Sequence, residues 1–215
     1  LLPHLSQYHM EGDDEACGRI VSRVFEIMLF LFLPCCVGLM LTADDLMVVM
    51  FGESFAPAGT TLRIAALLTL ALGFSNLFGT QVLLTFGEEK KLLWCTIAGA
   101  LSNVCLNFYL IPRFSQNGAA VASVISEALV TVCCVGFSRK HIHVGLRTGY
   151  LGKTVLAAAV MSILTWFVIG MVSGGLLRLA AAVLTGVVSY FAMCLLLRNP
   201  VCMEYKQLLL RRGKQ

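Results

Sequence analysis

The sequence places one carboxyl group, that of Glu127, near the middle of a long apolar stretch, residues 118–137. At helical spacings of three and four, four small residues share its face: Ala119, Ala122, Ser123 and Ser126. Small residues mark a surface where a neighbouring helix packs closely, and an ionisable group within a membrane span usually faces protein or a polar cavity. Two interpretations stay open. Glu127 is either a protonated carboxyl bonded to a neighbouring helix or a site coupled to H⁺ or Na⁺.

Side-chain amides repeat at helical spacing in two other apolar stretches. Gly99, Asn103 and Asn107 lie four residues apart and predict one shared helix face. In the preceding stretch, Gly73, Asn76 and Thr80 have similar spacing, and Gln81 is adjacent. Buried amides most often join helices by hydrogen bonds. The alternative is that Asn76, Gln81, Asn103 and Asn107 line a hydrophilic pathway for a polar substrate.

Three arginines lie at the ends of apolar stretches: Arg63, Arg113 and Arg178. Their aliphatic stems can lie along apolar surface while the guanidinium groups reach lipid headgroups. An ion pair of Arg63 with Asp44, Asp45 or Glu53 is also compatible with the sequence. A third alternative is phosphate binding, because guanidinium groups match the geometry of diphosphates.

Cysteine and histidine give no sign of a metal site or a catalytic centre. The nine cysteines include no pair with metal-ligand spacing, and most lie in apolar stretches, where Cys packs as a small apolar residue. His141 and His143 follow Arg139 and Lys140, and we interpret both as solvated loop residues, since two ligands do not make a site. The sequence therefore predicts no metal, no cofactor and no enzymatic activity.

The composition predicts that lipid surrounds these residues. The chain is 58% apolar and 13% charged, with a mean hydropathy of +0.84, whereas soluble domains are about 45–50% apolar and about 25% charged. A membrane-spanning helix needs roughly 20 mostly apolar residues. Six stretches are of that length: 25–43, 62–86, 92–111, 118–137, 154–172 and 176–197. We therefore expect an all-α, polytopic transmembrane helix bundle of about six spans.

The distribution of basic residues predicts the orientation. If both ends are cytoplasmic, thirteen of the 16 Lys and Arg residues lie on the cytoplasmic side, and Arg63, Arg113 and Arg178 lie opposite. This asymmetry accounts for the net charge of +4 without a nucleic-acid partner. The expected organisation is a cytoplasmic interfacial segment (1–24), four spans (25–137), a basic cytoplasmic loop (138–153), two further spans (154–197) and a basic tail (198–215) on anionic headgroups.

Several runs of the sequence resemble the polysaccharide flippases of the multidrug/oligosaccharidyl-lipid/polysaccharide exporter superfamily, whose fold is MATE-like. Their order and spacing over residues 1–137 carry the resemblance, and residues 138–215 agree only in hydropathy. The runs are 1–6 (LLPHLS), 51–58 (FGESFAPA), 62–64 (LRI), 73–84 (GFSNLFGTQVLL), 87–91 (GEEKK), 103–114 (NVCLNFYLIPRF) and 117–127 (NGAAVASVISE).

The resemblance implies an O-antigen or capsule flippase. Such a protein moves an oligosaccharide repeat unit on a polyprenyl diphosphate across the bacterial inner membrane, through a cavity between two six-helix lobes. The chain opens at Leu1 without an initiator Met, so we expect the C-terminal lobe plus two additional helices of a longer protein. Its partners would be the lipid-linked substrate, membrane lipids and the N-terminal lobe.

Three other functions stay open. A cation-coupled drug antiporter of the same superfamily would share the architecture and would be favoured by a more acidic cavity. A membrane-embedded glycosyl transferase or polymerase would need a catalytic cluster on a sizeable loop, and the loops between the predicted spans are short. A non-catalytic membrane scaffold would be favoured if the polar residues of the spans proved dispensable.

Overall fold

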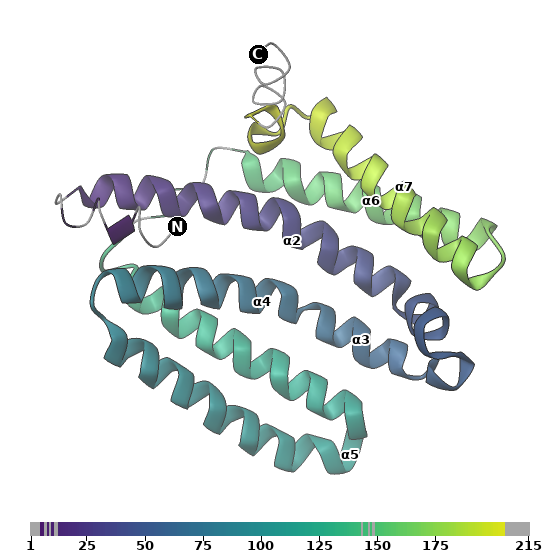
Figure 1. Cartoon of the computed structure of the whole chain (residues 1–215), viewed down its shortest axis with the longest axis horizontal. Helices are drawn as coiled ribbons and strands as arrows, with labels where there is room; N and C mark the ends of the chain where they lie inside the picture. The colour runs from purple at the N-terminus through teal and green to yellow at the C-terminus, as the bar shows by residue number, and fades with distance from the viewer. Residues whose placement is uncertain are drawn as a thin grey trace. The chain divides into compact units, whose positions relative to one another are not determined.

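A computed structural model describes residues 5, 6, 8, 10, 13–142, 144, 145, 147 and 149–204. The predicted tail beyond residue 204 and the first four residues of the predicted interfacial segment lie outside this part. Within it the chain is helical and has no strand (Figure 1). The elements are α2 (Asp14–Phe51), η1 (Glu53–Phe55), α3 (Ala58–Ala66), α4 (Leu68–Ser75), η2 (Asn76–Leu83), α5 (Glu89–Ser138), α6 (Tyr150–Met171) and α7 (Gly175–Leu196).

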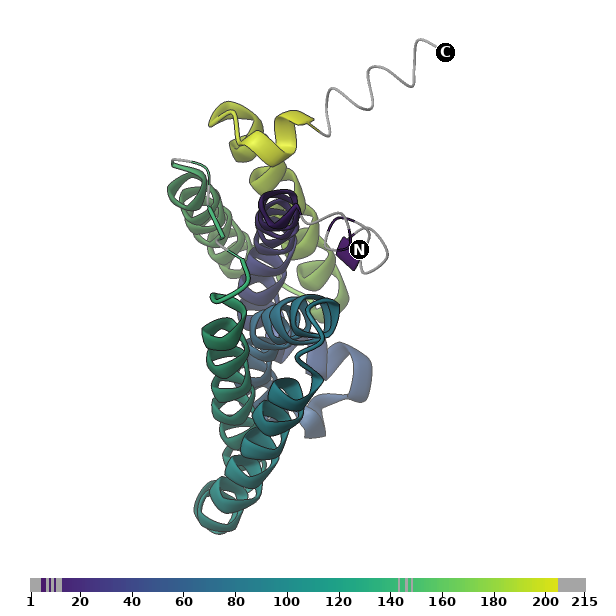
Figure 2. The ribbon, with the colours of Figure 1, turned by 90° about the vertical axis from the view of Figure 1, so that its left-hand side faces the viewer.

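Five helical runs of the described chain are long and apolar enough to cross a membrane: α2, Ala58–Leu83, α5, α6 and α7. The fifty residues of α5 form two arms, because Ser115 leaves helical geometry with φ of 51° and the chain reverses there (Figures 1 and 2). Gly118 makes the reversal compact, since a Cβ there would collide with the backbone of Leu110. With two arms in α5, the predicted bundle of six spans is confirmed.

The first span is longer than the apolar stretch 25–43 suggests. Asp13 accepts a hydrogen bond from the Ala16 amide at 2.8 Å, as an N-cap residue does, and acidic residues in the first turn suit the helix dipole. The helix ends before Gly52, whose φ is 93°. Polar caps, which a hydropathy window does not detect, therefore extend α2 through the predicted boundary at residue 24.

The chain folds into two compact units. Unit 1 comprises Leu1–Met28 and Ile64–Gly145, and unit 2 comprises Leu29–Arg63 and Leu146–Gln215. The division differs from the predicted grouping of the first four spans, because residues 29–63 pack with α6 and α7. Helix α2 contributes residues to both units, and each unit has its own packed interior.

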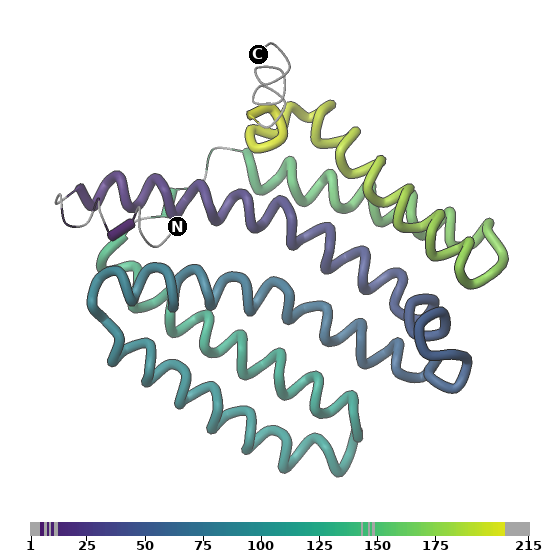
Figure 3. The backbone as a smooth tube through the Cα atoms, viewed as in Figure 1, coloured from purple at the N-terminus to yellow at the C-terminus, as the bar shows by residue number. Residues whose placement is uncertain are grey.

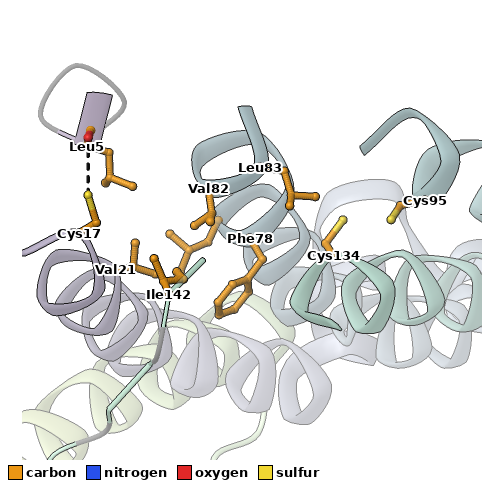
Figure 4. Packing of buried hydrophobic residues seen from close by; sticks show 10 residues of the cluster. Leu5, Cys17, Val21, Phe78, Val82, Leu83, Cys95, Cys134 and Ile142 are labelled. Atoms are coloured by element: carbon orange, nitrogen blue, oxygen red, sulfur yellow. Dashed lines mark hydrogen bonds between the residues drawn. The ribbon is translucent and has the colours of Figure 1, made fainter. Parts of the chain in front are cut away.

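Unit 1 packs the start of α2 and both arms of α5 around η2. Its buried cluster, drawn in Figure 4, contains Leu5, Cys17, Val21, Leu77, Phe78, Val82, Leu83, Cys95, Cys134 and Ile142. Cys95 and Cys134 extend toward each other from the two arms of α5 (Figure 4). Gly79 permits close contact of η2 with α5, since its Cβ would lie 2.9 Å from Leu92 and 3.2 Å from Cys134.

Unit 2 contains the remaining part of α2 with the hairpin of α6 and α7, which Figure 3 shows as adjacent helices joined by a short turn. The Tyr190 hydroxyl of α7 donates to the Phe30 carbonyl at 2.8 Å. In a regular helix the amide of residue 34 would bond this carbonyl, but Pro34 has no N–H. Tyr190 thus replaces the hydrogen bond that Pro34 removes, and both lie beside an apolar cavity of about 430 Å³.

Candidate functional site

The candidate site in unit 1 centres on Glu127 in the second arm of α5. Its side chain is half-buried, and its carboxylate accepts a hydrogen bond from the Ser75 hydroxyl at the end of α4. One turn further along the arm, the Thr131 hydroxyl lies 3.0 Å from the Ala71 carbonyl and 2.9 Å from the Glu127 carbonyl. Polar contacts therefore join this arm to α4, as expected for a carboxyl that faces a neighbouring helix.

The residues that follow Ser75 form a π-helical segment, η2, with hydrogen bonds from residue i to i+5. Asn76 is exposed, whereas Gly73 is buried and Thr80 is half-buried. The three residues therefore differ in exposure, and the wider π turn changes the angular spacing along the segment from Asn76 onward. Gln81 is half-buried, and its side-chain oxygen, itself buried, has no hydrogen-bond partner among the described residues.

Asn103 and Asn107 do share one face of the first arm of α5, as predicted. The Asn107 amide nitrogen donates to the Asn103 side-chain oxygen at 2.8 Å. Gly99, one turn earlier, faces the second arm, because its Cβ would lie 3.5 Å from the Ser126 carbonyl. In the part of the chain that the structure describes, neither amide bonds to Glu127. The polar residues thus form two separate groups: predicted Glu127 bonds to Ser75, and predicted Asn103 and Asn107 bond to each other.

The three arginines occupy different surroundings. In unit 2, Arg63 forms an ion pair with Asp44 and also donates to the Met40 carbonyl at 3.2 Å, and Arg178 forms an ion pair with Asp45. In unit 1, Arg113 lies over the Tyr109 ring, 3.6 Å from its centroid. The ion pair predicted for Arg63 is therefore present. Phosphate binding by these arginines stays a prediction.

One charged cluster lies outside the spans, where the loop before α5 meets the end of that helix. Glu88 accepts a hydrogen bond from Lys91, and His141 Nε2 lies 3.2 Å from the same carboxylate. The hydrogen bond from Lys91 is the main cause that lowers the pKa of Glu88, and His141 adds to it. His141 also packs on the Phe86 ring, with centroids 4.8 Å apart, and its side chain is 25% exposed, so it is partly covered rather than fully solvated. His143 lies outside the described residues.

Two polar residues of unit 1 were not among the predicted site residues. Ser75 lies in the run 73–84, but a hydroxyl in an apolar helix has no sequence signal that names its partner. Glu26 follows Phe25 at the start of an apolar stretch and is only 1% exposed, so it is more deeply buried than Glu127. Its position within an otherwise apolar run was the available signal. No group of three or more His, Cys, Asp or Glu residues in the described chain could hold a metal.

Comparison with known proteins identifies similar transporters. A Vibrio cholerae protein named as a lipid II flippase, MurJ, is 26% identical over 92% of this chain and 41% of its own length. A Haloferax volcanii protein named as a low-salt glycan biosynthesis flippase, Agl15, is 22% identical over 75% and 34%. An Escherichia coli protein named as an O-antigen transporter is 32% identical over 48% and 25%. The chain thus spans well under half the length of these relatives.

A solved structure described as lipid II flippase MurJ in an inward closed conformation has the same fold, with a TM-score of 0.71. It shares 17% sequence identity over 92% of this chain and 42% of that one. The profile of the family described as lipid II flippase MurJ matches residues 1–187. The predicted resemblance to flippases of the MATE-like exporter superfamily is confirmed, and this multi-pass membrane chain belongs to the lipid II flippase MurJ family.

Proposed function

We propose that the protein containing this chain translocates lipid-linked oligosaccharides across the bacterial inner membrane for the synthesis of surface polysaccharide or cell wall. The family match over residues 1–187 carries the proposal, and the flippase and O-antigen transporter names of its relatives support it. In this proposal the protein is a transporter and not an enzyme. Its partners are the lipid-linked substrate, membrane lipids and the rest of its own polypeptide, without nucleic acid.

The physical task explains why such a protein needs polar residues within its spans. A sugar diphosphate cannot cross hydrocarbon unaided, because removing its charges and hydroxyl groups from water costs too much free energy. A protein cavity can shelter the head group while the polyprenyl tail stays in lipid. Access to the two leaflets would alternate as this chain moves against the rest of the same polypeptide.

The residues divide into three roles in this proposal. Glu127 couples the motion to the binding and release of a cation. The amides of Asn76, Gln81, Asn103 and Asn107 meet sugar hydroxyl groups. Exposed Asn76 and the unpartnered oxygen of Gln81 support this role, since both retain hydrogen-bonding capacity. Arg63 and Arg178, held by aspartates, mainly join the helices of unit 2, and Arg113 is left to meet headgroups.

The test uses the full-length protein in bacteria depleted of their own flippase. One strain lacks the lipid II flippase and another lacks the O-antigen repeat-unit flippase, and outer-leaflet sugar is quantified with an impermeant enzyme or lectin. Restoration in either strain supports the proposal and identifies the substrate class. If neither strain is restored although the protein inserts into the membrane, the proposal fails. Export of a cationic dye under the same conditions would then indicate a drug antiporter.

A further inference from the structure

We propose that Ser75 and Glu127 form a proton-exchange pair, in which the serine hydroxyl stabilises both charge states of the carboxyl. The inference rests on the proposed function, because it specifies the ion and the partner for the coupling assigned to Glu127. Ser75 Oγ contacts the Glu127 carboxylate and also lies 3.2 Å from the Leu72 carbonyl.

These two contacts serve the ionised and the neutral carboxyl in turn. When Glu127 is ionised, Ser75 donates its hydrogen to the carboxylate, which has no hydrogen to give. When Glu127 takes a proton from a hydronium ion, an O–H bond of hydronium breaks, a new one forms on the carboxyl, and a water molecule is left. The protonated carboxyl then donates to Ser75 Oγ. The serine hydrogen then rotates to the Leu72 carbonyl. Release of the proton to water reverses both steps, and Ser75 is unchanged.

The surroundings leave the charge of Glu127 without a balancing cation. Helices α4 and η2 contain no charged residue, and the other charged residues of α5 lie at the ends of its first arm: Glu89, Lys90, Lys91 and Arg113. The part of α2 that packs on α4 through Phe25 and Phe74 contributes Arg23 and Glu26. The remaining titratable groups nearby are the thiols of Cys95, Cys133 and Cys134. Among the described residues, none forms an ion pair with Glu127.

The same geometry favours a proton over Na⁺. A sodium site needs several oxygen atoms arranged around a central space that the ion occupies. Here the Ser75 hydroxyl contacts the Glu127 carboxylate directly, and the Thr131 hydroxyl lies 3.0 Å from the Ala71 carbonyl. The Glu127 carboxylate is therefore bonded directly to one hydroxyl, an arrangement that accepts a proton without moving other oxygen atoms around an ion.

Infrared difference spectroscopy on the full-length protein in lipid nanodiscs tests the pair. The carboxylic acid band of Glu127 is assigned by its loss in Glu127→Gln, and Glu26→Gln and Asp45→Asn identify the bands of the buried carboxyls. Ser75→Ala removes both the donor to the carboxylate and the acceptor for the neutral carboxyl. Because the bond to the charged form is the stronger of the two, the titration midpoint of Glu127 should rise by about one pH unit. Ser75→Thr keeps the hydroxyl, so its titration midpoint should stay at that of the parent protein.

Thr131→Val is the matched control. It removes a hydroxyl contact between the same two helices but leaves the carboxyl oxygens of Glu127 in place. A Ser75→Ala shift no larger than that of Thr131→Val overturns the proposal, as does a spectrum in which no band lost in Glu127→Gln titrates. A midpoint that moves when Na⁺ replaces K⁺ also overturns it. This measurement requires no transport, so an intact pair in a protein that moves no sugar lipid contradicts only the proposed function.

Discussion

Neighbouring aspartates of α2 are expected to contribute very differently to stability. Asp45 is buried, with 7% of its side chain exposed, and pairs with Arg178, whereas Asp44 is 53% exposed and pairs with Arg63. Loss of one partner of a buried ion pair costs about 3–5 kcal/mol, because the other charge stays buried without compensation. The Arg178 side chain is 37% exposed, so water reaches the pair and the lower end of that range, about 3 kcal/mol, is expected for Arg178→Met.

A pair of double-mutant cycles measures this difference. One cycle combines Arg178→Met with Asp45→Asn, and the matched cycle combines Arg63→Met with Asp44→Asn, each read as the free energy of reversible unfolding in mixed micelles. The buried pair should show a coupling energy of about 2–3 kcal/mol, and the exposed pair about 1 kcal/mol or less. Equal coupling energies in the two cycles would refute the reasoning from burial.

Three further perturbations have expected outcomes. Tyr190→Phe should cost about 1–3 kcal/mol of unfolding free energy, but less in a Pro34→Ala background, where an N–H is restored to the same carbonyl. Gly118→Ala should disrupt the reversal of α5 and lower the melting temperature, whereas Gly136→Ala, with open space around its Cβ, should not. Because the pKa of Glu88 is lowered from 4.5, its stabilising effect is present above pH 4.5 and is lost as the pH falls through the lower folded value. Acid titration of unfolding should show this loss in the parent and not in Glu88→Gln.

Hydropathy and helical spacing predict much of this fold because lipid imposes them directly. A spanning helix must be apolar over about 20 residues, so the six stretches locate the two arms of α5 as well as α6 and α7. The same spacing rule places Asn103 and Asn107 on one face of a regular helix. Over η2 the helix widens to i+5 hydrogen bonding, which changes the angular spacing and which nothing in the sequence indicates.

The partners of polar residues are harder to predict than the helices that carry them. Asp44 and Asp45 are adjacent and chemically identical, yet one pairs with α3 and the other with α7. Successive residues point in different directions on a helix, and which neighbour each meets depends on packing between segments far apart in the sequence. The pairing of Tyr190 with a carbonyl 160 residues away has the same origin. Helical spacing predicts which face of a helix a polar residue occupies, and the packing of the folded unit determines which residue it contacts.

Three side chains join the second arm of α5 to α4 and η2, and the free energies of their contacts can be compared. Thr131 lies 3.0 Å from the Ala71 carbonyl, Ser138 donates to the Phe78 carbonyl at 3.0 Å, and Glu127 accepts from Ser75. A hydrogen bond between membrane helices contributes on average only about 0.6 kcal/mol, and a hydroxyl achieves it at little cost. An acidic residue at the centre of a span costs about 2.5–3.5 kcal/mol. A carboxyl at the centre of a span therefore costs more free energy than its one hydrogen bond contributes. Helix joining alone does not account for Glu127. The proposed proton exchange would use the ability to change charge, which threonine and serine lack.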